Sequence, residues 1–276
     1  MTNRIIIKSL TLLAACSALT AQAGVTSAPA PAPAPAPVTS DSLWSGSVSL
    51  GYDTDYIFRG VEVFGTGTHG RAEDLVTAAL DVNYAINDRW TWNFNAWYGS
   101  SAASGTDYEE LDLYTRLLYK VNDSFSFGPS FKYYYYPTFN PGNFDEQFEP
   151  GLEAIWTPCA NTTVNIGAFY ETEAEQLYVE LGVNHVFKIN DMFSLVPGAL
   201  ISYIDRDNGN WGGTPSDFNH AAVYLKAPIT LKSNVTLTPY IAVNIPLDGV
   251  DATTDSFSLS RQDEEFYGGA VLAVGF

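Results

Sequence analysis

The sequence has few cysteines, few basic residues and, after its first two dozen residues, no long apolar run. Two Cys cannot build a disulfide framework or a cysteine-based zinc site. The 13 Lys and Arg against 31 Asp and Glu give a formal net charge of −18, whereas a nucleic-acid binder needs a basic surface to meet phosphates. A membrane-spanning helix needs about 20 apolar residues. A helical membrane protein is therefore excluded, but a membrane β-barrel, whose strands alternate, is not.

The N-terminus is typical of an exported protein. Two basic residues precede an apolar stretch that ends in Ala21-Gln22-Ala23, the small-x-small form that signal peptidase reads. This predicts a signal peptide over residues 1–23, cleaved after Ala23. The run Leu13-Ala14-Ala15-Cys16 resembles a lipobox, so lipidation at Cys16 stays open as the alternative. Residues 24–44 are rich in Pro and Ala, which predicts an extended periplasmic spacer without a core.

From Ser45 to Phe276 the dominant pattern is strict alternation of apolar with small or polar side chains, the signature of half-buried strands. Twelve such segments follow one another. They cover residues 47–59, 76–86, 90–98, 110–121, 125–135, 148–156, 164–170, 177–187, 193–203, 221–231, 235–245 and 266–276.

Short connections with Asn and Asp alternate with mostly longer ones, which places all short turns and both termini on one side, as in outer-membrane barrels. Aromatic residues stand at both ends of the segments, Tyr56 and Phe58 among them, and two such girdles are what the two bilayer interfaces select. A barrel of about twelve strands is too wide for its side chains to fill. We therefore expect residues 45–276 to form an all-β, transmembrane, antiparallel up-and-down β-barrel with its apolar face outward.

A short motif adds a family resemblance. The run Tyr56-Ile57-Phe58-Arg59-Gly60 resembles the Tyr-x-Phe-Arg-Gly hallmark in the N-terminal strand of TorF-family porins, and the terminal Gly275-Phe276 resembles the aromatic signal that barrel-assembly machinery recognises. The resemblance implies a porin-like role in the bacterial outer membrane, with Phe276 as the assembly signal and with outer-membrane lipid and that machinery as partners.

The opposite face of the strands carries the candidate site. By parity we expect ten acids and five bases to face the lumen, and we expect water to reach them because unpaired charges in a dry interior are costly. Turn centres predict that Glu149 lies opposite Glu171 and that Lys132 lies opposite Glu153. The candidate pore-lining residues are Asp53, Asp55, Arg59, Asp81, Asp112, Arg116, Lys132, Glu149, Glu153, Glu171 and Glu180.

Catalysis finds no support in the sequence. The three His (His69, His185 and His220) stand in no motif that supplies a nucleophile and an orienting acid, so we expect no enzyme, no catalytic or metal-ligating residues and no cofactor. The sequence favours an outer-membrane channel for passive diffusion of small hydrophilic solutes, preferring cations because of the acidic lumen. The alternative is a structural or adhesive barrel that acts through its surface loops.

Overall fold

The computed structural model describes residues 42–63, 74–102, 108–138, 146–206, 216–251 and 264–276. The predicted signal peptide, Cys16, most of the spacer and His69 lie outside these ranges and stay predictions. Twelve long strands make up the described barrel. They are β1 (Trp44–Asp53), β4 (Leu75–Ala85), β5 (Trp90–Ser101), β6 (Glu109–Asn122), β7 (Phe125–Tyr135), β8 (Glu146–Cys159), β9 (Thr162–Glu171), β10 (Gln176–His185), β12 (Ser194–Arg206), β13 (Ser216–Lys226), β15 (Val235–Pro246) and β16 (Glu265–Gly275).

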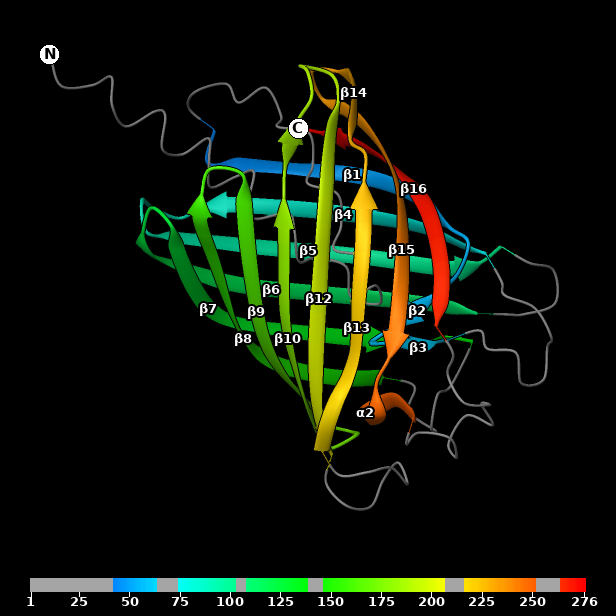
Figure 1. The fold of residues 1–276 in the computed structure, drawn as a ribbon. Helices are drawn as coiled ribbons and strands as arrows, with labels where there is room; N and C mark the ends of the chain where they lie inside the picture. Colours follow the sequence, from blue (N-terminus) through cyan, green and yellow to red (C-terminus); the bar gives the residue numbers. More distant parts are fainter. Residues whose placement is uncertain (1–41, 64–73, 103–107, 139–145, 207–215, 252–263) are drawn as a thin grey trace, which may run out of the picture.

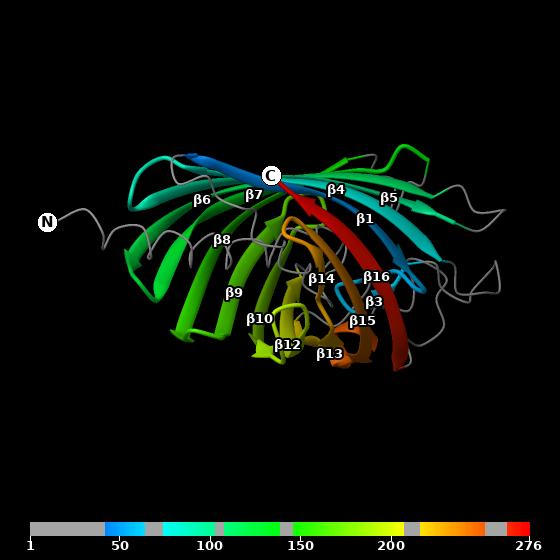
Figure 2. The ribbon, with the colours of Figure 1, turned by 90° about the horizontal axis from the view of Figure 1, so that it is seen from above.

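These strands form one closed antiparallel sheet, so the predicted fold is confirmed (Figures 1 and 2). Each strand pairs with its neighbour along the chain, and β1 closes the barrel against β16, with Val48 opposite Val274. Two short strands, β11 (Phe187–Lys188) and β14 (Ile229–Lys232), pair with β12 and β15. Closure leaves no unpaired edge among the twelve described strands, as a barrel requires where no water can satisfy backbone groups.

The alternation of the sequence becomes an apolar outside and a polar inside. Along β1, Val48 and Leu50 are half-exposed or more, whereas Ser47 and Asp53 are buried. The predicted outward face holds on the other strands as well, where Leu152 and Val223 are more than half exposed. An exterior of this kind suits hydrocarbon, whereas it would be an aggregation hazard in water.

One part of the predicted first strand is wrong. β1 ends at Asp53, and the chain then leaves the sheet and forms a separate hairpin of β2 (Ile57–Phe58) and β3 (Val61–Glu62). Tyr56 is only 1% exposed and Phe58 is half-buried, so neither belongs to an exterior girdle. Asp55 and Arg59 accordingly reach the interior from this hairpin segment and not from the wall. Alternation alone could not reveal this, because a period of two persists when the chain continues extended off the sheet.

The ends of the barrel agree with the predicted arrangement of the turns. The backbone of Phe276 exchanges two hydrogen bonds with Gly46, at 3.0 and 2.9 Å, so the first and last strands begin and end on the same rim. A one-turn helix, α2 (Asp248–Asp251), follows β15. Among the described residues, no helix is long and apolar enough to cross a membrane.

Candidate functional site

The β2–β3 hairpin lies inside the barrel, against the inner side of the wall (Figures 1 and 2). Its two central residues, Arg59 and Gly60, have φ values of 50° and 86°, and positive φ at both positions is what a two-residue type I′ turn requires. Val63 N–H donates to the carbonyl of Tyr56 at 2.8 Å and extends the hairpin. The turn therefore projects the Arg59 side chain from a loop into the lumen.

Arg59 contacts three strands of the opposite wall. Its guanidinium pairs with the carboxylate of Glu149 on β8 and, at 3.4 Å, with that of Glu171 on β9. Its Cζ also lies 4.3 Å from the centroid of the Tyr178 ring on β10. All four side chains are buried. Ion pairs shielded from water in this way are strong only when their geometry and hydrogen bonding are complete.

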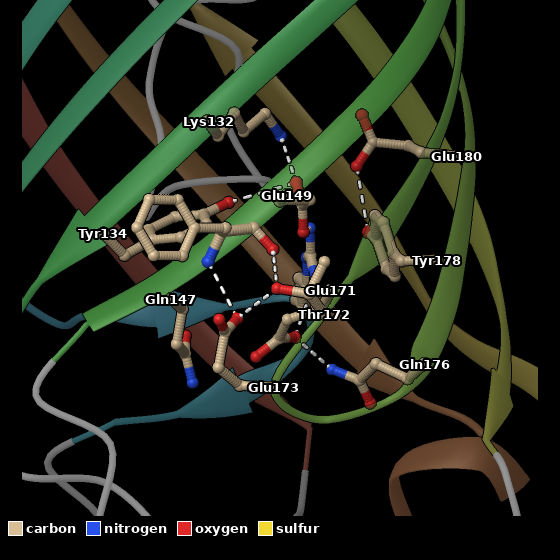
Figure 3. A network of polar contacts seen from close by, with 12 residues as sticks. Lys132, Tyr134, Gln147, Glu149, Glu171, Thr172, Glu173, Gln176, Tyr178 and Glu180 are labelled. Atoms are coloured by element: carbon tan, nitrogen blue, oxygen red, sulfur yellow. Dashed lines mark hydrogen bonds and ion pairs between the residues drawn. The ribbon is translucent and has the colours of Figure 1, made fainter.

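The carboxylates that meet Arg59 are themselves held by the wall (Figure 3). Lys132 donates to Glu149 Oε1 at 3.1 Å, and the Tyr134 hydroxyl donates to the same oxygen at 3.3 Å. Gln176 donates from its side-chain amide to Glu171 Oε2. Each carboxylate thus has a partner besides Arg59, which fixes its position within the barrel.

The aromatic and apolar residues before Arg59 anchor the hairpin. Tyr56 stacks on Trp97 with ring centroids 6.1 Å apart, and its hydroxyl donates to Glu110 at 2.5 Å. The rings of Phe58 and Tyr134 pack edge to face, with their centroids 5.8 Å apart. Ile57 is 1% exposed and lies in a buried cluster with Tyr224, Ala242 and Tyr267. The motif Tyr56-Ile57-Phe58-Arg59-Gly60 is therefore part of an internal hairpin, because its side chains dock on different parts of the wall.

Gly60 completes the docking on the remaining side. The side-chain amides of Asn219 and Asn244 donate to the carbonyls of Arg59 and Gly60, at 2.6 and 2.9 Å. A Cβ on Gly60 would lie 2.5 Å from Cβ of His220. His220 is fully buried and hydrogen-bonds through its two ring nitrogens to Asn244 and Tyr178. Only glycine fits this position, since both the positive φ and the contact exclude a side chain.

The base of the hairpin collects carboxyl groups. Asp55 and Glu62 are buried and share a side-chain hydrogen bond, with Glu265 of β16 near both. Burial, with the negative charge of neighbouring carboxylates, raises the pKa of Asp55 to about 6 and that of Glu62 to about 7. A hydrogen bond between two carboxyl groups needs one proton, so this contact is strongest when at least one of them is protonated.

Several other charges of the inner wall also have partners. Arg116 pairs with Glu153 at 3.1 Å, and Tyr114 donates to the other oxygen of that carboxylate at 2.5 Å. The Tyr240 hydroxyl donates to Asp53 at 2.5 Å, and the Asn95 amide donates to Asp81 at 3.0 Å. The interior is thus a network of charged groups and hydroxyls. Among the described residues, no group of His, Cys, Asp and Glu could hold a metal ion.

The structure places all eleven candidate residues inside the barrel. The predicted register between β8 and β9 holds at Glu149 and Glu171, because Gly151 lies opposite Phe169 and the same register continues to the hydrogen bond from Thr172 N–H to the carbonyl of Phe148, at 3.0 Å. Nearer the turn the register shifts by one residue, between Trp156 and Cys159. The predicted pairing of Lys132 with Glu153 is wrong, because Lys132 lies opposite Glu149. We expected water to reach these residues, but most of them are buried. The buried members are Asp53, Asp55, Arg59, Asp112, Arg116, Lys132, Glu149, Glu153 and Glu171, whereas Asp81 and Glu180 are partly exposed.

The sequence reasoning missed the residues that dock the hairpin, chiefly Asn219, Asn244 and His220. One signal was available. Arg59-Gly60 between two short apolar runs is a possible two-residue hairpin with glycine in the turn. Read in that way, the motif predicts a loop hairpin in place of a continuous strand.

Comparison with solved structures finds barrels of similar architecture. The KdgM porin has a TM-score of 0.49 at 9% identity, with 83% of this chain and 99% of that chain covered. An outer-membrane channel from Pseudomonas putida F1 has a TM-score of 0.49 at 12% identity (84% and 95% covered), and the NanC porin 0.48 at 12% (84% and 98% covered). A scan against family models finds no match, nor does a search of curated proteins. The TorF resemblance therefore stays a hypothesis that rests on one hairpin.

Proposed function

We propose that this protein is an outer-membrane channel for the passive diffusion of small hydrophilic solutes, with a preference for cations. The observation that carries the proposal is the contrast between the two faces of the wall. The outer face suits lipid, while the inner face is lined with carboxyl groups, basic groups and tyrosine hydroxyls. A barrel that served only as a membrane anchor would have no need for so many ionisable groups inside.

The preference for cations follows from the balance of charge inside. Among the described residues, eight acids and four bases are buried. The acids are Asp53, Asp55, Glu62, Glu110, Asp112, Glu149, Glu153 and Glu171, and the bases are Arg59, Arg116, Lys132 and Lys226. The field of the surplus carboxylates raises the local concentration of cations in a low-dielectric pore. The alternative, that these charges only stabilise the fold, predicts no selectivity between cations and anions.

The docked hairpin makes the proposed channel narrow. It occupies part of the lumen, and the inward side chains of Trp97, Tyr114, Tyr134, Tyr178 and Tyr224, all buried, fill more of it. We therefore expect small ions to pass more readily than large solutes.

A planar-bilayer recording of the refolded barrel tests the proposal. We expect discrete conductance steps and, in a KCl gradient, a reversal potential of the sign that a cation-selective pore gives. The selectivity should weaken at high salt, because charges are screened within about 10 Å at 0.1 M ionic strength. A correctly folded barrel without conductance steps would favour the structural or adhesive role, and an anion-selective reversal potential would refute the preference for cations.

A further inference from the structure

The partners of Arg59 form a binding site that is separable from the hairpin. Glu149, Glu171 and Tyr178 come from three consecutive strands of the wall, β8, β9 and β10. Arg59 lies in the turn of the hairpin, 90 residues before Glu149 in the sequence. The wall therefore supplies two carboxylates and an aromatic ring as partners for a cation, and the hairpin supplies the cation.

The chemistry of the site matches a guanidinium group. A planar guanidinium offers N–H donors on two edges, and Arg59 uses one terminal nitrogen for Glu149 and the other for Glu171. Its Cζ lies over the ring of Tyr178, 4.3 Å from the ring centroid. A compact ammonium group has neither the fork nor the flat face. Two carboxylates and an aromatic ring in this arrangement distinguish the two kinds of cation.

Each member of the site also has a partner outside the hairpin. Lys132 and Tyr134 hold Glu149, and Gln176 holds Glu171, without help from the hairpin. Tyr178 is likewise positioned through its hydroxyl, which lies 3.0 Å from Glu180 and 3.1 Å from the ring of His220. The wall should keep its shape when the guanidinium leaves.

We propose that Glu149, Glu171 and Tyr178 form a guanidinium-binding site inside the barrel, which Arg59 fills when the hairpin is docked and which guanidinium-bearing solutes fill when it is not. The proposal deepens the proposed function, on which it rests for the passage of solutes, by naming their class. A solute that binds only the emptied site favours the undocked hairpin by mass action. Binding of guanidinium solutes thus increases the population of the undocked hairpin and widens the lumen.

The test uses the refolded full-length barrel with Arg59→Ala and two probes, ethylguanidinium and ethylammonium. By titration calorimetry we expect ethylguanidinium to bind with a Kd below about 10 mM, and ethylammonium at least about tenfold more weakly, because it lacks the fork. The wild-type barrel should show no binding in this range, since Arg59 occupies the site. In the matched variant carrying both Arg59→Ala and Glu171→Gln, the affinity for ethylguanidinium should fall at least about tenfold.

A folded Arg59→Ala barrel that binds no ethylguanidinium, or binds it as well with Glu171→Gln, overturns the proposal. If Arg59→Ala does not fold, a second measurement decides. Ile57→Cys, in a Cys159→Ser background, places a thiol at a position that is 1% exposed in the docked hairpin. Ethylguanidinium, and not ethylammonium, should speed its labelling by a small maleimide, and an equal rate with both probes refutes the competition.

Neither readout requires current to flow. A barrel that binds ethylguanidinium but shows no conductance would refute the channel and leave the site standing. A conducting barrel without such binding would do the reverse.

Discussion

Removing the guanidinium of Arg59 should release the hairpin and widen the lumen. In Arg59→Ala, the pairs with Glu149 and Glu171 and the contact with Tyr178 are lost together. The two carboxylates, which the register of β8 and β9 places at opposite positions, would then lie close together without the cation between them. We therefore expect the docked hairpin, and not the barrel itself, to be destabilised.

The size of the effect follows from burial. Removing one partner of a buried ion pair costs about 3–5 kcal/mol because the other charge is left behind. Here Glu149 keeps Lys132 and Tyr134, and Glu171 keeps Gln176, so the lower end of that range applies. A loss of about 3 kcal/mol lowers the ratio of docked to undocked hairpin by a factor of about 150. Arg59→Lys keeps a positive charge but not the fork, and its effect should be intermediate.

The assay is single-channel conductance of the two variants beside wild type, with folding checked by heat-modifiable migration. Arg59→Ala should conduct more than wild type.

A second perturbation, at Gly60, should also undock the hairpin, without changing its charge. Gly60→Ala places a Cβ 2.5 Å from Cβ of His220 at a φ of +86°, whereas the control Gly182→Ala meets no atom closer than 3.9 Å. The reasoning is refuted if folded Arg59→Ala and Gly60→Ala barrels conduct like wild type and like Gly182→Ala.

Three further outcomes are expected. Asp55 and Glu62 have pKa values of about 6 and 7 in the docked hairpin, above the ordinary 3.8 and 4.5. Docking is therefore favoured fully below about pH 4 and loses this stabilisation as the pH rises through 6 to 7; conductance should be higher at pH 8 than at pH 5, and Glu62→Gln should flatten the profile. Deleting Phe276 should impair insertion of the barrel but not export, and an unchanged amount of heat-modifiable outer-membrane protein would contradict this. In intact cells, a cysteine at Thr138 should react with a label that cannot cross the outer membrane, whereas one at Ser124, in a short turn, should not; the reverse result would invert the orientation.

The wall of the barrel was predictable from the sequence because each strand carries its own information. Alternation sets which side chains point inward, and the short connection between β8 and β9 limits the register to within one residue. The turn pairs Cys159 with Thr162, and a register shift between Trp156 and Cys159 restores the pairing that the alternation requires further along the strands. Lys132 was misplaced because a long connection leaves the register open. The observed pairing with Glu149 differs from the predicted one by four residues along β8.

The interior of the barrel was less predictable because its contacts are long-range. Tyr56 and Phe58 keep the parity of the strand that precedes them, so local pattern assigned them to lipid. Their true positions depend on partners such as Glu110 and Tyr134, 54 and more residues away along the chain. At Arg59 and Gly60 the alternation predicts a strand, whereas the structure has a turn with positive φ. Positions where the local pattern and the final structure disagree are often functional.

The central claim, a channel constricted by its own hairpin, is tested most directly by replacing residues 56–63 with a short Gly-Ser linker and recording single-channel conductance. The twelve long strands of the barrel wall are untouched by this change, and the entropy of loop closure depends only weakly on the length of a connection. We expect a heat-modifiable barrel whose conductance step is severalfold larger than that of wild type and still cation-selective. An unchanged conductance step would show that the hairpin does not constrict the path, and a folded barrel that conducts nothing would contradict the channel itself.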